Sequence, residues 1–250
     1  MTPDPQREIR SRTRRSLITG AAAALAGGAA WEWLSTRRED DGIQWPLRLA
    51  LRANEQLTRD YFKPARLART FPPGAVESGR VNGDIGIKDP VPADWSLKVA
   101  VASDDGNREF QLSLADIQAL PKVEQITELK CIEGWTRVLR WGGARFRDFV
   151  ARHAPDRVDF DEGNDYVGME TPDAKYYVGL EMASAMHPQT LLAYEMNGKP
   201  LTGQHGAPLR LVIPLKYGIK NLKRIGKISF AFTRPPDFWG EQGYDWYAGF

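Results

Sequence analysis

The stretch that decides the fold is Leu129-Lys130-Cys131-Ile132-Glu133-Gly134-Trp135. Residues 124–131, which lead into it, alternate polar and apolar side chains, the pattern of a half-buried strand. We therefore predict a strand that ends at Cys131, where a turn begins. Cys131 is the single cysteine of the 250-residue chain, so its thiol cannot form an intramolecular disulfide and must be free, metal-bound or inert.

The sequence alone leaves the role of Cys131 open. A lone cysteine is most often a small buried hydrophobic residue. Lys130, Arg137 and Arg140 are close in sequence, however, and are expected to lower the pKa of the thiol. A thiolate serves either as a nucleophile or as a ligand for a soft metal.

A second group of candidate residues lies at 203–210 and 214–223. Gly206 and Gly218 leave backbone N–H groups accessible there. Side chains that add donors or positive charge are His205, Arg210, Lys216, Lys220 and Lys223. Together these groups predict a phosphate cradle, with a solvated basic face as the alternative interpretation.

Further along the chain the pattern is one of short elements. Strands are predicted at residues 97–101, 165–170, 175–180, 191–196, 208–213 and 226–232. Short helices are predicted at residues 113–121, 145–153 and 181–186, and a longer helix outside the main core at 43–61, with Pro64 as its stop. Regular βαβ alternation is absent, so an α+β architecture of mainly short mixed β-sheets with a few short helices is expected.

The net charge of +2 does not describe the folded part of the chain. The first 38 residues hold seven Arg and three acidic residues, so the rest carries 27 of the 34 basic and 29 of the 32 acidic residues. A nearly neutral domain gives no support for nucleic-acid binding by bulk electrostatics.

The N-terminus has the layout of a twin-arginine export signal. Arg14 and Arg15 follow a basic region and precede a mild apolar run rich in Gly and Ala. Residues 17–34 are about long enough to span a bilayer, because roughly 20 residues are needed. We therefore expect a periplasmic protein exported by the twin-arginine route, and cleavage and retention as a membrane anchor both remain open.

The order of several short motifs resembles the sulfite-oxidase-fold family of molybdenum enzymes. These motifs are Cys-x-Glu-x-Trp at residues 131–135, Trp-Gly-Gly at 141–143, Met-His-Pro-Gln-Thr-Leu-Leu at 186–192 and His-Gly-Ala-Pro-Leu-Arg at 205–210. Lys-Tyr-Gly-x-Lys at 216–220 and Tyr-x-x-Tyr-Ala at 244–248 are similar to the bacterial periplasmic methionine sulfoxide reductase catalytic subunits. The reductases have Asn where this chain has His205, which matches the sulfite oxidases.

The resemblance implies a sulfite-oxidase-type molybdopterin-binding fold and a molybdenum-molybdopterin cofactor. Cys131 would be the molybdenum ligand and Glu133 a second catalytic residue beside it. The implied cofactor-binding residues are Asn82, Thr171, His205, Arg210, Gly218, Ile219 and Lys220. Residues 1–42 would be the signal or anchor, 43–80 a helical lead-in and 81–250 the oxidoreductase domain.

The implied activity is oxo transfer to or from a small substrate such as a sulfoxide or a sulfite-like compound. A single cysteine provides no Cys-x-x-Cys-His haem site, so we expect electrons to be exchanged with a membrane haem or quinone-linked partner, or with a soluble cytochrome.

Other functions are consistent with the residues alone. Cys131 could act as a nucleophile with His153, His187 or His205 as its base. A zinc site from the same four residues is weaker, because their separations lack paired-ligand spacing. A membrane-tethered, non-catalytic binding protein with an aromatic surface is the third alternative.

Overall fold

The computed structural model describes residues 5–40, 42–63, 65–102, 106–159 and 165–249. The chain divides into two compact units, Met1–Arg52 and Ala53–Phe250. The division predicted from the sequence, at residues 42 and 80, remains a prediction.

The first unit is mainly helical. It contains helix α1 (Pro5–Ser35), a small hairpin of β1 (Glu39–Asp40) and β2 (Ile43–Gln44), and the start of helix α2 (Trp45–Tyr61). The sequence predicted a helix at residues 43–61, and α2 confirms it, although Pro64 lies outside the described residues. In the part of the chain that the structure describes, no helix combines the length and the apolar character needed to cross a bilayer.

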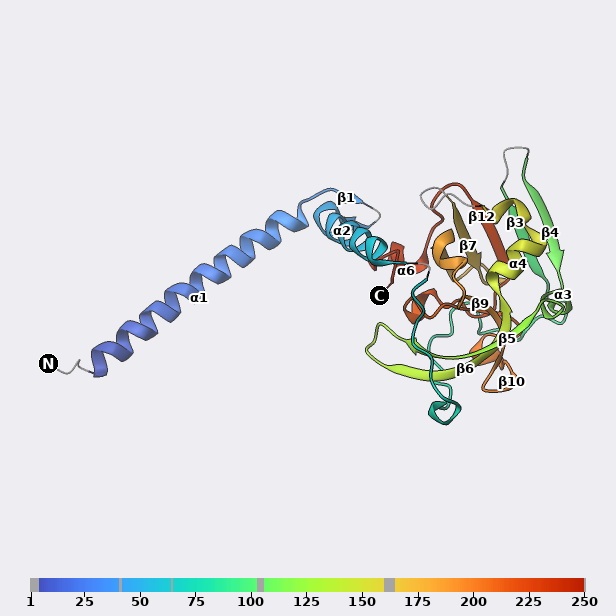
Figure 1. The fold of residues 1–250 in the computed structure, drawn as a ribbon. Coiled ribbons are helices and arrows are strands. Elements are labelled where there is room, and N and C mark those ends of the chain that lie inside the picture. The colour runs from blue at the N-terminus through green and yellow to red at the C-terminus, as the bar shows by residue number, and fades with distance from the viewer. Residues whose placement is uncertain (1–4, 41, 64, 103–105, 160–164, 250) are drawn as a thin grey trace. The chain divides into compact units, whose positions relative to one another are not determined.

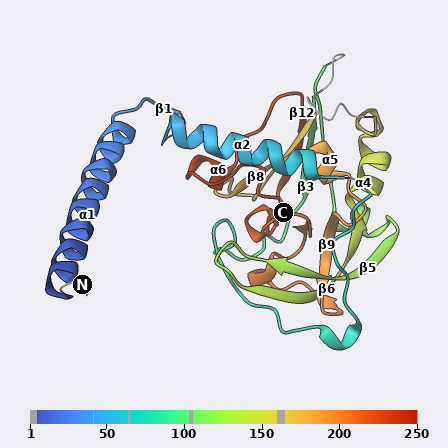
Figure 2. The same cartoon turned by 60° about the vertical axis from the view of Figure 1, so that its left-hand side comes forward.

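The second unit contains two five-stranded sheets (Figures 1 and 2). The antiparallel sheet has β5 (Lys122–Lys130) and β6 (Thr136–Arg145) as a hairpin, followed by β9 (Leu191–Met196), which pairs with β10 (Lys199–Pro200) and β11 (Arg210–Val212). The mixed sheet has the order β4 (Arg108–Leu112), β3 (Leu97–Val101), β12 (Lys227–Ala231), β7 (Tyr166–Glu170) and β8 (Tyr177–Glu181). Only the pairing of β12 with β3 is parallel in this mixed sheet.

Short helices connect the strands. These are α3 (Leu114–Gln118), α4 (Phe146–His153), α5 (Met182–Ala185) and α6 (Phe238–Glu241), with 3-10 turns η1 (Pro73–Ala75), η2 (Pro155–Arg157), η3 (Gly203–His205) and η4 (Gly218–Lys220). The predicted cap of α3 is confirmed: Ser113 Oγ accepts from Asp116 N at 3.2 Å, and Asp116 Oδ2 accepts from Ser113 N at 2.7 Å. The α+β prediction is confirmed.

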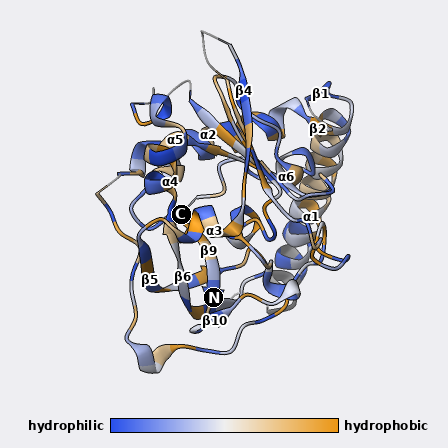
Figure 3. Cartoon of the chain, turned by 90° about the vertical axis from the view of Figure 1, so that its right-hand side faces the viewer, coloured by the Kyte–Doolittle hydropathy of each residue, from blue (hydrophilic) through white to orange (hydrophobic). Residues whose placement is uncertain are grey.

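Alternating burial along the strands builds the core. Leu97, Val99 and Val101 are buried on one face of β3 while Lys98 is exposed on the other. In Figure 3 the strands carry both hydrophobic and hydrophilic segments. This core holds the mixed sheet, α4 and part of the antiparallel sheet together. The residues of the β5–β6 turn are not part of it and are therefore available for a functional site.

Strand β6 was not predicted, because Gly142 and Gly143 lower the strand character of its centre. A Cβ added at Gly143 would come 2.2 Å from Leu192 O, so β6 and β9 approach each other too closely for a side chain there. The pairing register shifts between Gly142 and Gly143. The Trp-Gly-Gly motif therefore serves strand packing.

Candidate active site

Cys131 directly follows strand β5, at the start of a turn, as the sequence predicted, and this turn is the tip of the β5–β6 hairpin. Its N–H donates to Trp135 O at 2.9 Å, and the Gly134 N–H donates to Cys131 O at 3.1 Å. Gly134 has φ of 86°, which favours glycine at this position. The two strands thus hold the thiol in a short, defined turn.

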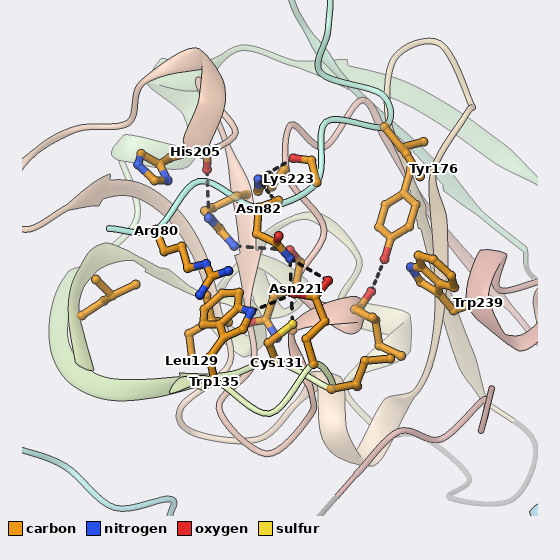
Figure 4. A pocket seen from close by; sticks show the side chains of 18 of the residues that line it. Arg80, Asn82, Leu129, Cys131, Trp135, Tyr176, His205, Asn221, Lys223 and Trp239 are labelled. Atoms are coloured by element: carbon orange, nitrogen blue, oxygen red, sulfur yellow. Dashed lines mark hydrogen bonds between the residues drawn. The ribbon is translucent and has the colours of Figure 1, made fainter. Parts of the chain in front are cut away.

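The turn forms one wall of a cavity of about 250 Å³ (Figure 4). Segments far apart in sequence meet there: the loop near residue 82, the hairpin tip, η3, β11, η4 and the start of α6. The residues predicted for the site that line this cavity are Cys131, Glu133, Asn82, His205, Arg210, Gly218 and Ile219. A pocket with convergent polar groups is where a cofactor or substrate is expected.

Asn82 links the thiol to Glu133. Its Nδ2 lies 3.9 Å from Cys131 Sγ and 3.5 Å from Glu133 Oε1. Trp135 Nε1 donates to Glu133 Oε2 at 2.9 Å, and this bond, followed by the one from Asn82, lowers the pKa of Glu133. Glu133 is consequently ionised at neutral pH, which suits a fixed acceptor better than a proton donor.

The thiol itself is half-buried, and burial raises the pKa of Cys131. The expectation that Lys130, Arg137 and Arg140 lower this pKa is wrong, because the pKa is raised and burial is the largest cause of the shift. Arg80 is the cation that opposes the shift, and its guanidinium lies 4.7 Å from the Trp135 ring centroid.

His205 and Lys223 lie across the cavity from Cys131 (Figure 4), and Arg210 lines the same cavity. Arg210 is almost completely buried, donates to His205 O at 2.9 Å and stacks 4.7 Å from the Trp141 centroid. Burial lowers its pKa to about 10. Burial, and then the charge of Arg210, lowers the pKa of Lys223 to about 8. Burial also lowers the pKa of His205, so its ring is neutral at pH 7.

These three side chains fit an anionic group. Glu133 is the one acidic residue among those that line the cavity. Arg210 Nε is buried and has no hydrogen-bond partner within the described structure, although a buried polar atom normally has one. Lys223 is held in place by its bonds to Asn82 O at 2.7 Å and Gly83 O at 2.9 Å. A phosphate would supply the acceptor that Arg210 lacks.

Two predicted residues do not line the cavity. Lys220 is fully buried, and its Nζ donates to Asp237 Oδ2 at 2.5 Å and to Gly179 O at 2.8 Å, so its ammonium group is engaged inside the domain. Thr171 Oγ1 donates to Asp173 Oδ1 at 2.6 Å and packs beneath Gly86. Lys216, also considered as a donor, pairs with Glu181 at 2.7 Å and is likewise buried.

Several lining residues were not predicted as site residues, namely Arg80, Tyr176, Asn221, Trp239 and Tyr244. Tyr176 donates from its hydroxyl to Ile219 O at 2.5 Å, and Asn221 accepts from Ile213 N at 2.9 Å. Both side chains fix the segment around η4. Tyr244 lies in the Tyr-x-x-Tyr-Ala motif noted above, whereas no local pattern marks the other four residues, which reach the cavity through tertiary packing.

Of the three histidines considered as a base for Cys131, His205 alone lines the cavity of Cys131, and among the described residues no hydrogen bond joins its ring to the thiol. His187 is buried beside Gln189, and His153 packs on Phe149 with ring centroids 5.2 Å apart. Neither lines the cavity that contains Cys131. Among the described residues there is no group of three or more His, Cys, Asp or Glu side chains arranged to hold a metal ion.

The fold and the cavity, with one thiol facing a cluster of basic groups, define a cofactor-binding oxidoreductase. The chain belongs to the family described as the oxidoreductase molybdopterin binding domain, whose model matches residues 83–239. This match covers the hairpin, both sheets and all residues that line the cavity except Arg80, Asn82 and Tyr244, and it confirms the resemblance stated from the motifs.

Relatives with assigned names are similar in sequence. The chain is 30% identical over 240 residues to the "Putative protein-methionine-sulfoxide reductase subunit YedZ1" of Azospira oryzae, covering 94% of this chain and 86% of that protein. It is 38% identical over 158 residues to the protein-methionine-sulfoxide reductase catalytic subunit MsrP of Xanthomonas campestris pv. campestris, covering 58% and 47%. For the MsrP of Campylobacter jejuni the identity is 35%, covering 58% and 52%.

The matched part thus spans about half the length of these two catalytic subunits. One solved structure, the sulfane dehydrogenase SoxCD from Paracoccus pantotrophus, is similar with a TM-score of 0.47 and 17% identity, over 69% of this chain and 47% of that chain.

Proposed function

We propose that this protein is an exported molybdopterin-dependent oxidoreductase that reduces a small sulfoxide, with Cys131 as the protein ligand of molybdenum. One observation carries the proposal: Cys131 lines the same cavity as Arg210, whose buried Nε has no hydrogen-bond partner among the described residues. A soft thiolate suits the metal, and a desolvated guanidinium suits a phosphate.

The basic residues would hold the anionic end of the cofactor. Arg210 and Lys223 offer charged donors, and His205, neutral at pH 7, offers a ring nitrogen. A Cβ at Gly218 would come 3.3 Å from Lys130 O, so this glycine lets η4 pack close to the hairpin tip, and Asn82 bridges the tip to the basic side. Thr171 and Lys220 would support the cofactor indirectly, because neither lines the cavity.

When bound, the molybdenum centre supplies two-electron oxygen-atom chemistry, in which a sulfoxide, two electrons and two protons give a sulfide and water. The chain contributes the shape of the site. Trp135, Trp239 and Tyr244 line the cavity with large rings, and Arg80 places a positive charge near the thiol. A positive charge there would stabilise the oxygen of a polar S–O bond.

Export and the electron partner are also part of the proposal. The paired Arg14 and Arg15 ahead of an apolar run support periplasmic delivery by the twin-arginine route. Relatives are named as a subunit or a catalytic subunit, which supports a separate electron-carrying protein, such as a membrane haem or quinone-linked protein or a soluble cytochrome.

Metal and pterin analysis of purified protein tests the proposal. Wild type should contain molybdenum and pterin and should reduce an aryl methyl sulfoxide with reduced methyl viologen as donor. Cys131→Ser should lose activity and molybdenum, and Arg210→Met should lose both pterin and metal. Lys199→Met, a change of an exposed lysine on β10, is the matched control and should match wild type. Equal molybdenum in wild type and Cys131→Ser would refute the ligand assignment.

A further inference from the structure

A second cavity, of about 300 Å³, opens on the other side of strand β5. It is formed by the end of α2, residues 62–63 and 66–69, the end of β5, the Pro214–Leu215 segment and Tyr247. None of its lining residues lines the cavity of the active site. Nothing in the proposed mechanism uses it.

Neighbouring residues at the end of strand β5 line the two different cavities. Because side chains alternate along a strand, Leu129 and Cys131 line the active site, whereas Glu128 and Lys130 line the second cavity. A molecule in the second cavity would be separated from Cys131 by one layer of strand, roughly 10 Å with side chains included. Electrons can cross such a distance directly.

The rim of the second cavity is fixed by the Met186–Leu192 motif, which the active site does not use. The buried ring of His187 places Nε2 3.2 Å from Arg66 O and meets the Phe62 ring edge-on at 6.2 Å. Gln189 accepts from Ala68 N at 2.7 Å and donates to Ala68 O at 3.0 Å. Burial lowers the pKa of His187, so these contacts persist as neutral hydrogen bonds at pH 7. The rim is therefore preorganised.

The side chains of this rim combine positive charge with apolar surface. Lys63, Arg66 and Arg69 are exposed, and none has an ion-pair partner among the described residues. Arg66 lies over the Tyr61 ring at 4.3 Å and Arg69 over Phe71 at 4.7 Å, so both guanidinium groups are held against aromatic surface. Glu128, the acidic residue of the lining, lies 3.8 Å from Lys130.

We infer that this basic rim is the docking surface for the electron donor, an acidic protein that carries one electron at a time. The inference rests on the proposed function. The carboxylates of the donor protein would face Lys63, Arg66 and Arg69. The redox group of the donor would lie over the second cavity, next to Lys130. Two successive electrons would pass through β5 toward Cys131, and together with two protons they would reduce one sulfoxide to sulfide and water.

The test uses the loaded full-length enzyme with two donors. Flavodoxin hydroquinone is an acidic protein that gives up one electron, and reduced methyl viologen is a small donor that needs no docking surface. The variant is Arg66→Glu/Arg69→Glu, which leaves the backbone bonds to His187 and Gln189 in place. Lys199→Glu reverses an exposed charge on β10 and serves as the control.

We expect the KM for flavodoxin to rise at least about tenfold in the double variant at an ionic strength of about 20 mM, and the difference to shrink below about twofold at 0.5 M. Viologen-driven turnover should stay within about twofold of wild type, and Lys199→Glu should match wild type with both donors. An unchanged KM for flavodoxin with normal viologen turnover would overturn the docking inference and leave the proposed function in place. Absence of viologen turnover in wild type would instead contradict the proposed function.

Binding to anionic vesicles tests whether a lipid surface, instead of a protein, occupies the basic rim. Wild type and the double variant would be sedimented with phosphatidylglycerol vesicles. Equal sedimentation of both proteins supports a protein partner at this rim, whereas loss of sedimentation in the double variant with an unchanged flavodoxin KM assigns the rim to lipid and overturns the inference.

Discussion

Lys220 and Asp237 form an ion pair of 2.5 Å in which the two side chains are 0% and 3% exposed. Asp237 also accepts from Gly179 N at 3.1 Å and caps α6 by accepting from Gly240 N at 2.9 Å. One carboxylate therefore joins β8, η4 and α6 directly behind the wall of the active site.

Asp237→Ala should destabilise the protein strongly. The change leaves the ammonium of Lys220 buried without a counter-charge, a situation that costs about 3–5 kcal/mol. Urea unfolding followed by tryptophan fluorescence measures the effect. Lys175→Ala breaks the exposed pair of Lys175 with Asp173, whose atoms are 3.4 Å apart, and should cost less than about 1 kcal/mol. Similar unfolding midpoints for the two variants would contradict the role assigned to the buried pair.

Gly143→Ala should also destabilise the protein, through backbone contact. Its Cβ would come 2.2 Å from Leu192 O and 2.6 Å from Ala193 Cα, and backbone atoms at these distances cannot move aside cheaply. Overpacking of this kind costs about 1–3 kcal/mol or more. Gly74→Ala, where nothing lies within 4 Å, is the control and should leave the midpoint nearly unchanged in the same urea experiment. Equal losses at both positions would argue against a close approach of β6 and β9.

Anion binding by cofactor-free protein should weaken as the pH rises through about 8. The pKa of Lys223 is lowered to about 8 by burial and by Arg210, so the ammonium is charged below this pH and neutral above it. His205 is already neutral at pH 7 and adds no charge across this range. Sulfate keeps a constant charge in this range and is a suitable probe.

Isothermal titration of sulfate at pH 7 and pH 9 should show an affinity loss of about three- to tenfold for wild type. Lys223→Met should bind weakly at both pH values. Lys227→Met, in which a half-buried lysine near Glu170 is changed, should keep the pH dependence of wild type. A flat profile for wild type would show that Lys223 does not titrate in contact with the anion.

The sequence predicted the residues that carry the chemistry of the site better than it predicted the other residues that line the cavity. The position of Cys131 follows from a local pattern, alternation that stops at a turn, and local patterns survive folding. His205 and Arg210 were found because they share one short loop with glycines. Arg80 and Tyr176 were missed because they reach the cavity from segments remote in sequence, which a single chain read linearly does not reveal.

Three lysines show most clearly which roles the sequence alone could not assign. Lys216, Lys220 and Lys223 occur in one basic run, and nothing in that run separates their roles. The structure turns Lys223 toward the cavity and buries Lys216 and Lys220 in ion pairs with Glu181 and Asp237. Their partners lie on β8 and before α6, so only the tertiary fold could assign them.

Tyr176→Phe should loosen cofactor binding without changing the chemistry of the loaded site. Its hydroxyl donates to Ile219 O in the turn η4, and removal leaves a half-buried carbonyl without that donor, at a cost of about 1–3 kcal/mol. Tyr177, the next residue, donates instead to the exposed Glu241, so Tyr177→Phe is a matched control. Pterin content after prolonged dialysis should fall several-fold in Tyr176→Phe and stay at the wild-type level in Tyr177→Phe. Turnover per bound molybdenum should be the same in all three proteins, because neither hydroxyl is assigned a step in the reaction. If turnover per metal fell in Tyr176→Phe while pterin content held, the hydroxyl would act on the substrate and the turn would be fixed by other contacts, Asn221 first among them.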